Sequence, residues 1–205
     1  MSDFTYEFEN HEAKLEKNEW DHVWWERADT EGVPRVLYIG DSISCGTRRV
    51  ATEVAEEKIF FDGLGTSKGI DNPYFSDTVR MFAAQQKERA AIAFNNGLHG
   101  WHLEDATEYK AYYEQMVQFL MKAFPESPLL LVLTTHVQNP ERAARVMVRN
   151  KAVLELAEKY GLKTVDLYSI TKQNEALFSQ DGVHLLPEGY KALAEQLVKN
   201  VKEVI

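Results

Sequence analysis

Residues 35–46 read Arg-Val-Leu-Tyr-Ile-Gly-Asp-Ser-Ile-Ser-Cys-Gly. The apolar run at the start of this stretch is typical of a strand that is buried on both faces. The glycine and the small polar residues after it indicate a tight turn into a helix. In an open parallel sheet, ligands bind at such turns, because the loop carries free side chains and the helix N-terminus is positively polarised. Ser42 is therefore the first candidate functional residue.

The rest of the chain alternates short apolar runs with longer segments of helical periodicity, which predicts strand-helix-strand units around a parallel sheet. The expected strands are 35–39, 58–61, 90–94, 129–134 and 164–167, and the expected helices are 76–88, 107–124, 140–160 and 187–204. Pro140 and Pro187 stand where a first helical turn accepts proline, and Gly161 stands where a helix commonly ends. The sequence thus predicts an α/β fold with a five-stranded parallel sheet.

The composition is that of one globular domain. The 205 residues are 44% hydrophobic and 27% charged, and the single cysteine, Cys45, excludes an intramolecular disulfide. The net charge is −9, to which the first 33 residues contribute −7, from ten acidic residues against Lys14, Lys17 and Arg27. We therefore expect neither a nucleic-acid nor a membrane partner, since both need a basic surface. No signal peptide or membrane span is visible, so the expected location is the cytoplasm.

Residues 1–33 contain three tryptophans, Trp20, Trp24 and Trp25, and we interpret this segment as a helix on the outside of the domain. A unit of this length is too short to fold alone without disulfides or a metal. We expect residues 1–33 to be a helical extension packed on a domain of residues 34–205. Such an extension is compatible with a homo-oligomer.

Two loops carry candidate catalytic groups. Ser42 fits either a nucleophile or the N-cap of the following helix, and its own loop does not separate the two. Asp181 and His184 lie three residues apart before the last expected helix. This spacing suits a carboxylate that orients an imidazole, whose other nitrogen takes a proton from a serine. Alone, the pair also fits a capping aspartate beside a surface histidine.

Taken together, Tyr38-Ile39-Gly40-Asp41-Ser42-Ile43 and the segment 181–189 resemble the first and last sequence blocks of the SGNH hydrolases, also called the GDSL lipase/esterase superfamily. The resemblance extends from Arg35 to the C-terminus. It implies a flavodoxin-like three-layer α/β/α sandwich. It also implies a Ser-His-Asp triad, with Ser42 as nucleophile, His184 as general base and Asp181 as the group that orients the imidazole.

The oxyanion-binding blocks of that superfamily are less well matched. Its Gly-x-Asn-Asp block corresponds to Ala93-Phe94-Asn95-Asn96, where the glycine and the aspartate are replaced. The resemblance assigns the amide donor to Asn95, with Asn96 as the alternative, although an Asn-Asn-Gly turn without a catalytic role also fits. It assigns the remaining donors to the N–H groups of Ser42 and Gly65.

His99 and Trp101 follow the asparagines directly and are, with Asn96, candidates for lining the mouth of the site. His99 and His102, with Glu104 and Asp105, could be drawn as a metal site, but zinc needs three or four ligands in a fixed geometry, and we expect no metal. Three arginines have the helical spacing of a solvated face: Arg142, Arg145 and Arg149.

We expect a serine esterase that hydrolyses small-acyl esters, above all acetyl esters, through an acyl-enzyme and without a cofactor. The loop 94–101 looks like that of a branch of the superfamily associated with carbohydrate O-acetylesterases, so the expected small-molecule substrate is an acylated sugar. Two alternatives stay open. One is a thioesterase or lysophospholipase of the same superfamily, and the other is a flavodoxin-like binding module without turnover, which the altered asparagine block favours.

Overall fold

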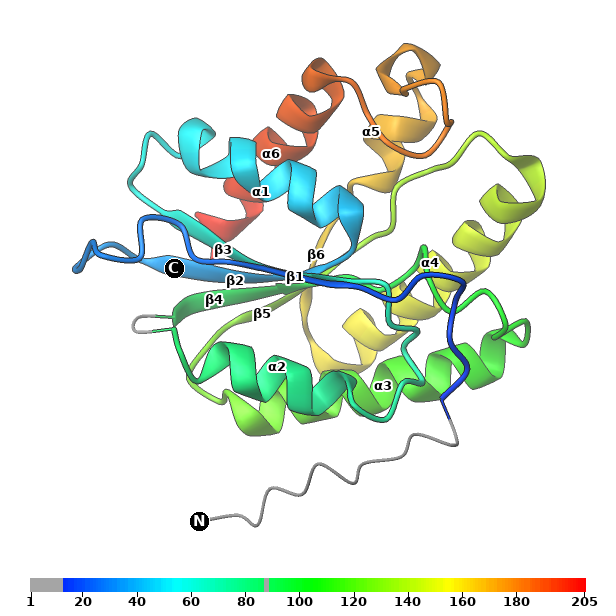
Figure 1. Ribbon diagram of the computed structural model, residues 1–205, viewed down its shortest axis with the longest axis horizontal. Coiled ribbons are helices and arrows are strands. Elements are labelled where there is room, and N and C mark those ends of the chain that lie inside the picture. The colour runs from blue at the N-terminus through cyan, green and yellow to red at the C-terminus, as the bar shows by residue number, and fades with distance from the viewer. Residues whose placement is uncertain (1–12, 87–88) are drawn as a thin grey trace.

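A six-stranded sheet forms the centre of the computed structural model, which describes residues 13–86 and 89–205 (Figure 1). The strands are β1 (Asp21–Trp24), β2 (Arg35–Gly40), β3 (Phe60–Thr66), β4 (Arg89–Phe94), β5 (Leu129–Val132) and β6 (Lys163–Val165). Their order is β1-β3-β2-β4-β5-β6. Strands β2 to β6 run parallel, and β1 pairs antiparallel with β3. The parallel strands therefore have the order of a flavodoxin-like sheet.

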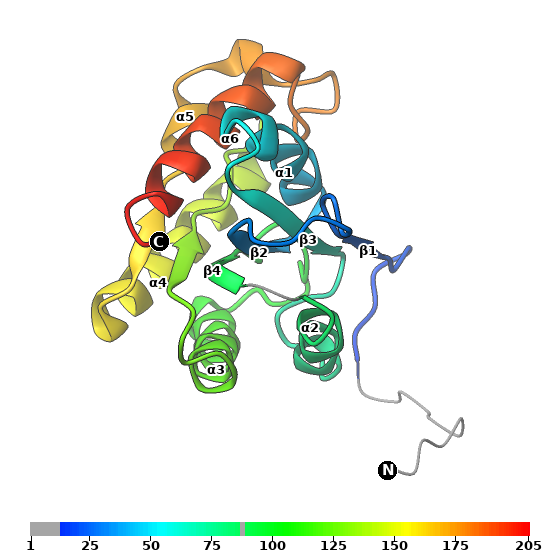
Figure 2. The same cartoon turned by 90° about the vertical axis from the view of Figure 1, so that its left-hand side faces the viewer.

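Helices cover both faces of this sheet (Figure 2). They are α1 (Ser42–Val54), α2 (Phe75–Ala83), α3 (Ala106–Ala123), α4 (Pro140–Tyr160), α5 (Tyr168–Lys172) and α6 (Pro187–Val201), with a short 3-10 turn, η1 (Glu175–Leu177). Helices α1 and α6 pack together on one face, whereas α2 and α3 lie on the other, and α4 packs beside α3. The predicted three-layer α/β/α sandwich is confirmed.

The two hydrophobic layers follow from the alternation of side chains along each strand. In β2, Val36 and Tyr38 belong to the cluster with α1 and α6, whereas Leu37 and Ile39 belong to the cluster with α2 and α3. All four side chains are buried. The strand reads as an unbroken apolar run because both of its faces are covered.

The bounds of two elements differ from the expected ones by several residues. Strand β3 continues to Thr66, past the expected end at residue 61, because residues 60–65 pair with β2 and residues 63–66 pair with β1. Helix α2 ends at Ala83 rather than at 88, although residues 87–88 lie outside the described residues. The caps of α4 are confirmed, since Pro140 stands in the first turn and Gly161 ends the helix with a φ of +64°.

The expected helix over residues 1–33 is wrong for the part that the structure describes. Residues 21–24 form the edge strand β1, which makes the sheet six-stranded rather than five-stranded and is antiparallel to its neighbour. The free hydrogen-bonding edge of β3 provides backbone partners that a surface helix would not use. Trp25 then stacks on Phe82, with ring centroids 4.0 Å apart. Residues 1–12 lie outside the described residues.

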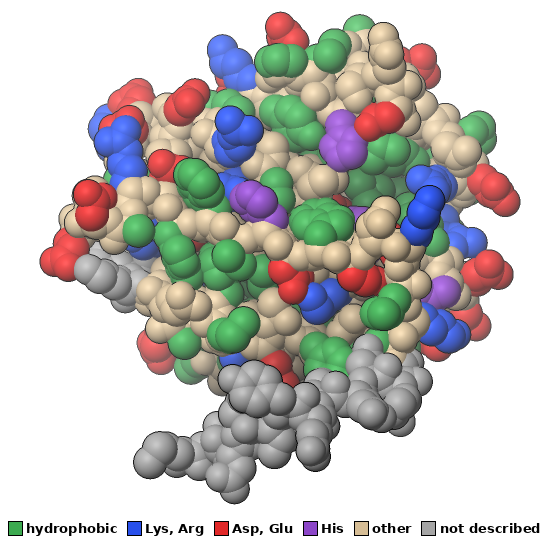
Figure 3. Space-filling view, in the orientation of Figure 1, with side chains coloured by type: hydrophobic (Ala, Val, Ile, Leu, Met, Phe, Trp, Pro, Cys, Tyr) green, Lys and Arg blue, Asp and Glu red, His purple; other side chains and the backbone are tan. Residues whose placement is uncertain are grey.

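Among the helices of the described residues, none has the length and apolar character needed to cross a membrane. Acidic and basic side chains are interspersed over the face seen in Figure 3, so no field of a single sign covers it.

A buried ion pair ties the N-terminal segment to the sheet. The Arg35 guanidinium donates to Asp62 Oδ1 at 2.9 Å, and the two side chains are 5% and 0% exposed. Arg35 also donates to the carbonyls of Glu26 and Arg27, while Asp62 accepts from the Glu26 N–H. Burial raises the pKa of Asp62, and the hydrogen bonds that it accepts from Gln86, the Glu26 N–H and Arg35 act against that rise, as does the charge of Arg35.

We expect Asp62→Ala to lower the free energy of unfolding by about 3–5 kcal/mol, because Arg35 would be left buried without its carboxylate. Urea denaturation followed by circular dichroism measures this loss. The control is Asp77→Ala, which removes an exposed pair with Arg80 and should change stability by less than about 1 kcal/mol. Equal effects of the two substitutions would contradict the importance of the buried pair.

Candidate active site

Ser42 lies at the carboxyl end of the central strand β2, as the first residue of α1. The N-cap of that helix is Asp41, whose Oδ1 accepts from the Ile43 N–H at 2.9 Å. Ser42 is therefore not the capping residue, and its half-buried hydroxyl is free for another role. Its N–H belongs to the first helical turn, where N–H groups have no acceptor within the helix.

Asp181 and His184 are held by one tight turn. Asp181 Oδ1 accepts from the N–H groups of Val183 and His184, each at 2.9 Å, and from the Ser179 hydroxyl at 2.8 Å. Gly182 makes the turn with a φ of +68°, a value that favours glycine. The following helix α6 has Leu186 as its N-cap, so Asp181 does not cap it.

A line of two hydrogen bonds joins these residues to Ser42. Asp181 Oδ2 lies 2.6 Å from His184 Nδ1, and His184 Nε2 lies 2.8 Å from Ser42 Oγ. An ionised carboxylate only accepts, so the proton of the neutral ring is on Nδ1, and Nε2 accepts from the serine hydroxyl. The hydrogen bond from His184 and those from the backbone hold the pKa of Asp181 well below its usual range. The structure thus brings together the three residues of the predicted triad.

Of the two asparagines, Asn96 rather than Asn95 has an amide proton to spare. Asn95 Nδ2 donates to the Val132 carbonyl at 2.8 Å and to Thr134 Oγ1 at 2.9 Å, so both of its protons are used at the end of β5. Asn96 Nδ2 makes one bond, to the Lys68 carbonyl at 2.8 Å. The placement of Asn95 therefore contradicts its expected role as the oxyanion donor, because its amide serves the packing of β4 against β5.

Gly65 is also not placed as expected. It lies inside β3, between Gly40 of β2 and His22 of β1, rather than in a loop. Backbone N–H groups two residues apart in a strand point to the same side. The Ser67 N–H donates to the Trp20 carbonyl, next to β1, so the Gly65 N–H also points toward β1. A Cβ at Gly65 would lie 2.2 Å from Cys45 Sγ. Gly65 is therefore a packing position and not an oxyanion donor.

Cys45 does not compete with Ser42 as a nucleophile. Its sulfur packs on Gly65, and burial raises the pKa of the thiol despite the nearby charge of Arg48. A partly buried thiol whose pKa is raised is mostly protonated near neutral pH and is a poor nucleophile.

The loop after Asn96 depends on Arg149, which the sequence spacing had placed on a solvated face. That prediction is wrong for this residue, whose side chain is buried. It donates to four carbonyls of the loop, those of Gly97, His99, Gly100 and Leu103, at 2.7–3.2 Å. The loop has no helix or strand hydrogen bonds that would satisfy these carbonyls. The buried guanidinium of Arg149 supplies the missing donors. Only the tertiary contact distinguishes Arg149 from the partly exposed Arg145.

His99 and His102 each bind a different carboxylate. His99 Nδ1 lies 3.0 Å from Glu16, and His102 Nε2 lies 2.7 Å from Asp71. Within residues 13–86 and 89–205, no three His, Cys, Asp or Glu side chains are grouped so that they could hold a metal ion.

Several cavities among the described residues are lined by no triad residue, and two of them contain an indole ring beside charged side chains. One of about 200 Å³ is lined by Trp101, Glu141, Arg142 and Arg145, and the guanidinium carbons of Arg142 and Arg145 lie 5.3 and 5.7 Å from the Trp101 ring centroid. The other, of about 410 Å³, lies between β1 and α1 and is lined by none of the triad residues.

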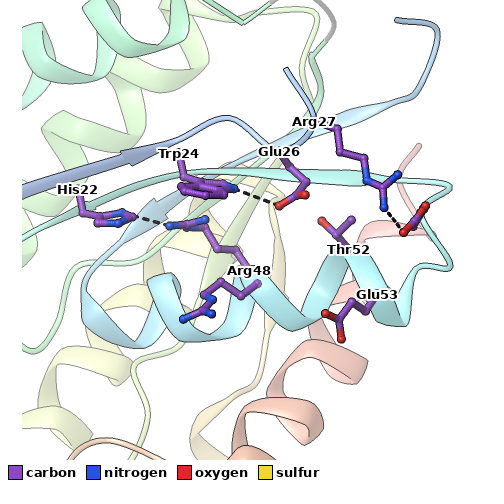
Figure 4. A pocket seen from close by; sticks show the side chains of 9 residues that line it. His22, Trp24, Glu26, Arg27, Arg48, Thr52 and Glu53 are labelled. Atoms are coloured by element: carbon purple, nitrogen blue, oxygen red, sulfur yellow. Dashed lines mark hydrogen bonds and ion pairs between the residues drawn. The ribbon is translucent and has the colours of Figure 1, made fainter. Parts of the chain in front are cut away.

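Figure 4 shows the larger cavity, where Arg48 lies against Trp24 and donates to His22 Nδ1 at 3.1 Å. Arg27 and Glu57 form an ion pair at its opposite end. Its side chains thus bond mainly to one another.

Comparison with protein families and with curated proteins finds no match. Solved structures do match. A lipolytic protein of the G-D-S-L family from Veillonella parvula has a TM-score of 0.67 and 16% identity, over 82% of this chain and 97% of that one. The chain has the SGNH hydrolase fold. An acetyl xylan esterase has a TM-score of 0.65 and 19% identity, over 82% and 99% of the two chains. A carbohydrate acetylesterase from Sinorhizobium meliloti has a TM-score of 0.67 and 13% identity, over 84% and 100%.

For this SGNH-fold protein, we expect Arg149→Met to lower the free energy of unfolding by about 2–4 kcal/mol, because the buried carbonyls of the loop would lose their donors. Thermal and urea denaturation measure the loss. Arg142→Met, on an exposed part of the same helix, is the matched control. It should stay within about 1 kcal/mol of the wild type, because it loses only the contact of its guanidinium with the Trp101 ring. An Arg149→Met protein as stable as the control would show that the loop does not need the guanidinium.

Proposed function

We propose that the protein is a serine esterase that hydrolyses short-acyl esters. The observation that carries this proposal is the line of hydrogen bonds from Asp181 through His184 to Ser42. A serine hydroxyl is a weak nucleophile unless a base takes its proton, and this arrangement provides the base and the group that orients it. Part of the imidazole is exposed, with 45% of its side-chain surface accessible, so an ester can approach it.

The reaction begins when Ser42 Oγ attacks the ester carbonyl carbon and its proton passes to His184 Nε2. The Asp181 carboxylate stabilises the resulting imidazolium. The tetrahedral intermediate then expels the alcohol, which takes the proton from His184, and the acyl group remains on Ser42. Water attacks the acyl-enzyme, its proton passes to His184 and then to Ser42 Oγ, and the carboxylic acid leaves.

Two donors are proposed for the oxyanion: the Ser42 N–H and the second amide proton of Asn96. The Ser42 N–H lies at the positive end of α1, which stabilises a nearby negative charge. The Asn96 amide is uncharged, so it can donate to the oxyanion without the repulsion that a carboxylate would cause. With Asn96 in this role, the altered asparagine block no longer favours a binding module without turnover.

An acetyl ester of a carbohydrate is the proposed substrate. Structural neighbours described as an acetyl xylan esterase and a carbohydrate acetylesterase support it. The cavity beside Trp101 adds support, because an indole with polar neighbours suits a sugar ring. We propose that Trp101 contacts the alcohol half of the ester.

Ser42→Ala should reduce the kcat for 4-nitrophenyl acetate by a factor on the order of 10⁶, because the attacking oxygen is lost. The initial rate of 4-nitrophenolate release measures this loss, with the wild-type protein and an enzyme-free blank alongside. Turnover that survives the substitution would refute the proposed nucleophile.

The same assay with acetyl, butyryl, octanoyl and dodecanoyl esters and thioesters then tests the acyl preference. Greater kcat/KM for the long chains or for thioesters would replace the acetylesterase proposal by the lysophospholipase or thioesterase alternative. Release of acetate from acetylated xylose and acetylated xylan tests the sugar.

Asn96→Ala and Asn95→Ala should have opposite signatures. Asn96→Ala removes a proposed oxyanion donor, so kcat should fall by about 10²–10³, and the loss of its single bond to the Lys68 carbonyl should cost only about 0.5–1.5 kcal/mol of stability. Asn95→Ala removes the buried donor to the Val132 carbonyl, so it should cost about 1–3 kcal/mol of stability. Kinetics of 4-nitrophenyl acetate hydrolysis and urea denaturation of both variants separate the two effects. The reverse pattern would return the donor role to Asn95.

A further inference from the structure

Residues 16–20, which we call the strap, directly precede β1 in the sequence. The strap begins in contact with the loop after β4 and ends at the start of β1. At one end of the strap, the Glu16 carboxylate has two partners in the loop that follows Asn96. Its Oε1 accepts from the Gly100 N–H at 3.2 Å, and its Oε2 lies 3.0 Å from His99 Nδ1. The Glu16 and His99 side chains are 30% and 16% exposed, so the contact is partly shielded from water.

At the other end, the strap is bonded to the loop after β3. The Ser67 hydroxyl donates to Glu19 at 2.6 Å and accepts from the Trp20 N–H at 2.8 Å, and the Ser67 N–H donates to the Trp20 carbonyl at 3.1 Å. The Trp20 ring also meets His99 edge-on, with centroids 5.9 Å apart. The strap therefore binds two loops that are far apart in the sequence.

Asn96 lies between these two attachments. Its amide donates to the carbonyl of Lys68, the neighbour of Ser67, and its own chain leads within three residues to His99. Arg149 holds the same loop from inside through its carbonyls, whereas Glu16 holds it from outside through the Gly100 N–H. The two contacts use opposite backbone groups of Gly100, so neither replaces the other.

We propose that Glu16 is a positioning residue, which holds the loop that carries Asn96 so that its free amide proton meets the oxyanion. This inference rests on the proposed esterase function. An oxyanion donor acts only when it is fixed before the charge develops, because a donor that must reorganise during the reaction loses much of its stabilising effect. A contact that only added stability would not act on the transition state in this way.

The test compares Glu16→Ala with Glu16→Gln. The alanine variant removes both contacts. The glutamine variant keeps an oxygen that can accept from the Gly100 N–H. Its new amide N–H can donate to His99 Nδ1 once the ring carries its proton on Nε2 instead of Nδ1. The control is Glu155→Ala, which removes an exposed carboxylate bonded to Lys110 on the distant α3–α4 surface. Two quantities are measured in each full-length protein: kcat and KM for 4-nitrophenyl acetate, and the hydrogen-exchange rate of the Gly100 amide.

For Glu16→Ala we expect kcat to fall by about 10- to 100-fold, with KM changed less than about twofold, because the displaced donor acts in the transition state. The Gly100 amide should exchange faster, since it loses its acceptor. Glu16→Gln should recover most of kcat and of the protection, and Glu155→Ala should match the wild type in both measurements.

Wild-type kcat in Glu16→Ala, or an equal loss in Glu16→Gln and Glu16→Ala, would overturn the positioning role. Unchanged exchange at Gly100 would show that the strap does not hold the loop and would overturn it as well. Absence of Ser42-dependent hydrolysis in the wild-type protein is a different result, because it would overturn the esterase function and the catalytic role of Glu16 while the exchange rates still reported the strap contact.

Discussion

The contact of 2.8 Å between His184 Nε2 and Ser42 Oγ joins residues that are 142 positions apart, and it depends on how the parallel sheet is covered. Helix α1 must leave the end of β2 on the same face as α6, because the two helices share one hydrophobic layer. The loop before α6 is then held at this edge by the bond from the Gln138 N–H to the Gly182 carbonyl. The candidate triad is thus a consequence of burying one face of the sheet.

The opposite side of the candidate site is built from irregular backbone, which a protein can fix only by giving its polar groups partners. Arg149 binds the carbonyls of the 97–103 loop, and Asn95 binds the end of β5. Asn150 both donates to and accepts from the backbone of Thr134. These buried polar groups give partners to a loop that has no regular secondary structure, and the proposed oxyanion donor on that loop requires such fixing.

The acidic N-terminal segment contributes to the same rigidity. Several of its carboxylates are bonded rather than merely solvated: Glu16 binds the 97–103 loop, Glu19 binds Ser67, and Asp21 accepts from Lys68 at 2.5 Å and from Thr66 at 2.6 Å. These carboxylates therefore accept from donors of the 97–103 loop and of the end of β3.

Local sequence patterns were enough to predict the features that depend on residues close together in the sequence. The apolar run of β2, the turn at Ser42, the Asp181–His184 pair and the caps of α4 could all be predicted, because strand alternation, turn chemistry and capping involve residues a few positions apart. Such patterns also supported a layered α/β fold, and the superfamily resemblance identified its flavodoxin-like form.

Only the tertiary structure decided which asparagine has a free amide, that Gly65 packs against Cys45, that Arg149 is buried, and that residues 21–24 are a strand. In each case the deciding partner is distant in the sequence: β5 for Asn95, α1 for Gly65, the 97–103 loop for Arg149 and β3 for the N-terminal segment. The residue type limits what a side chain or backbone can bind, but the packing of remote elements determines which of those bonds is made.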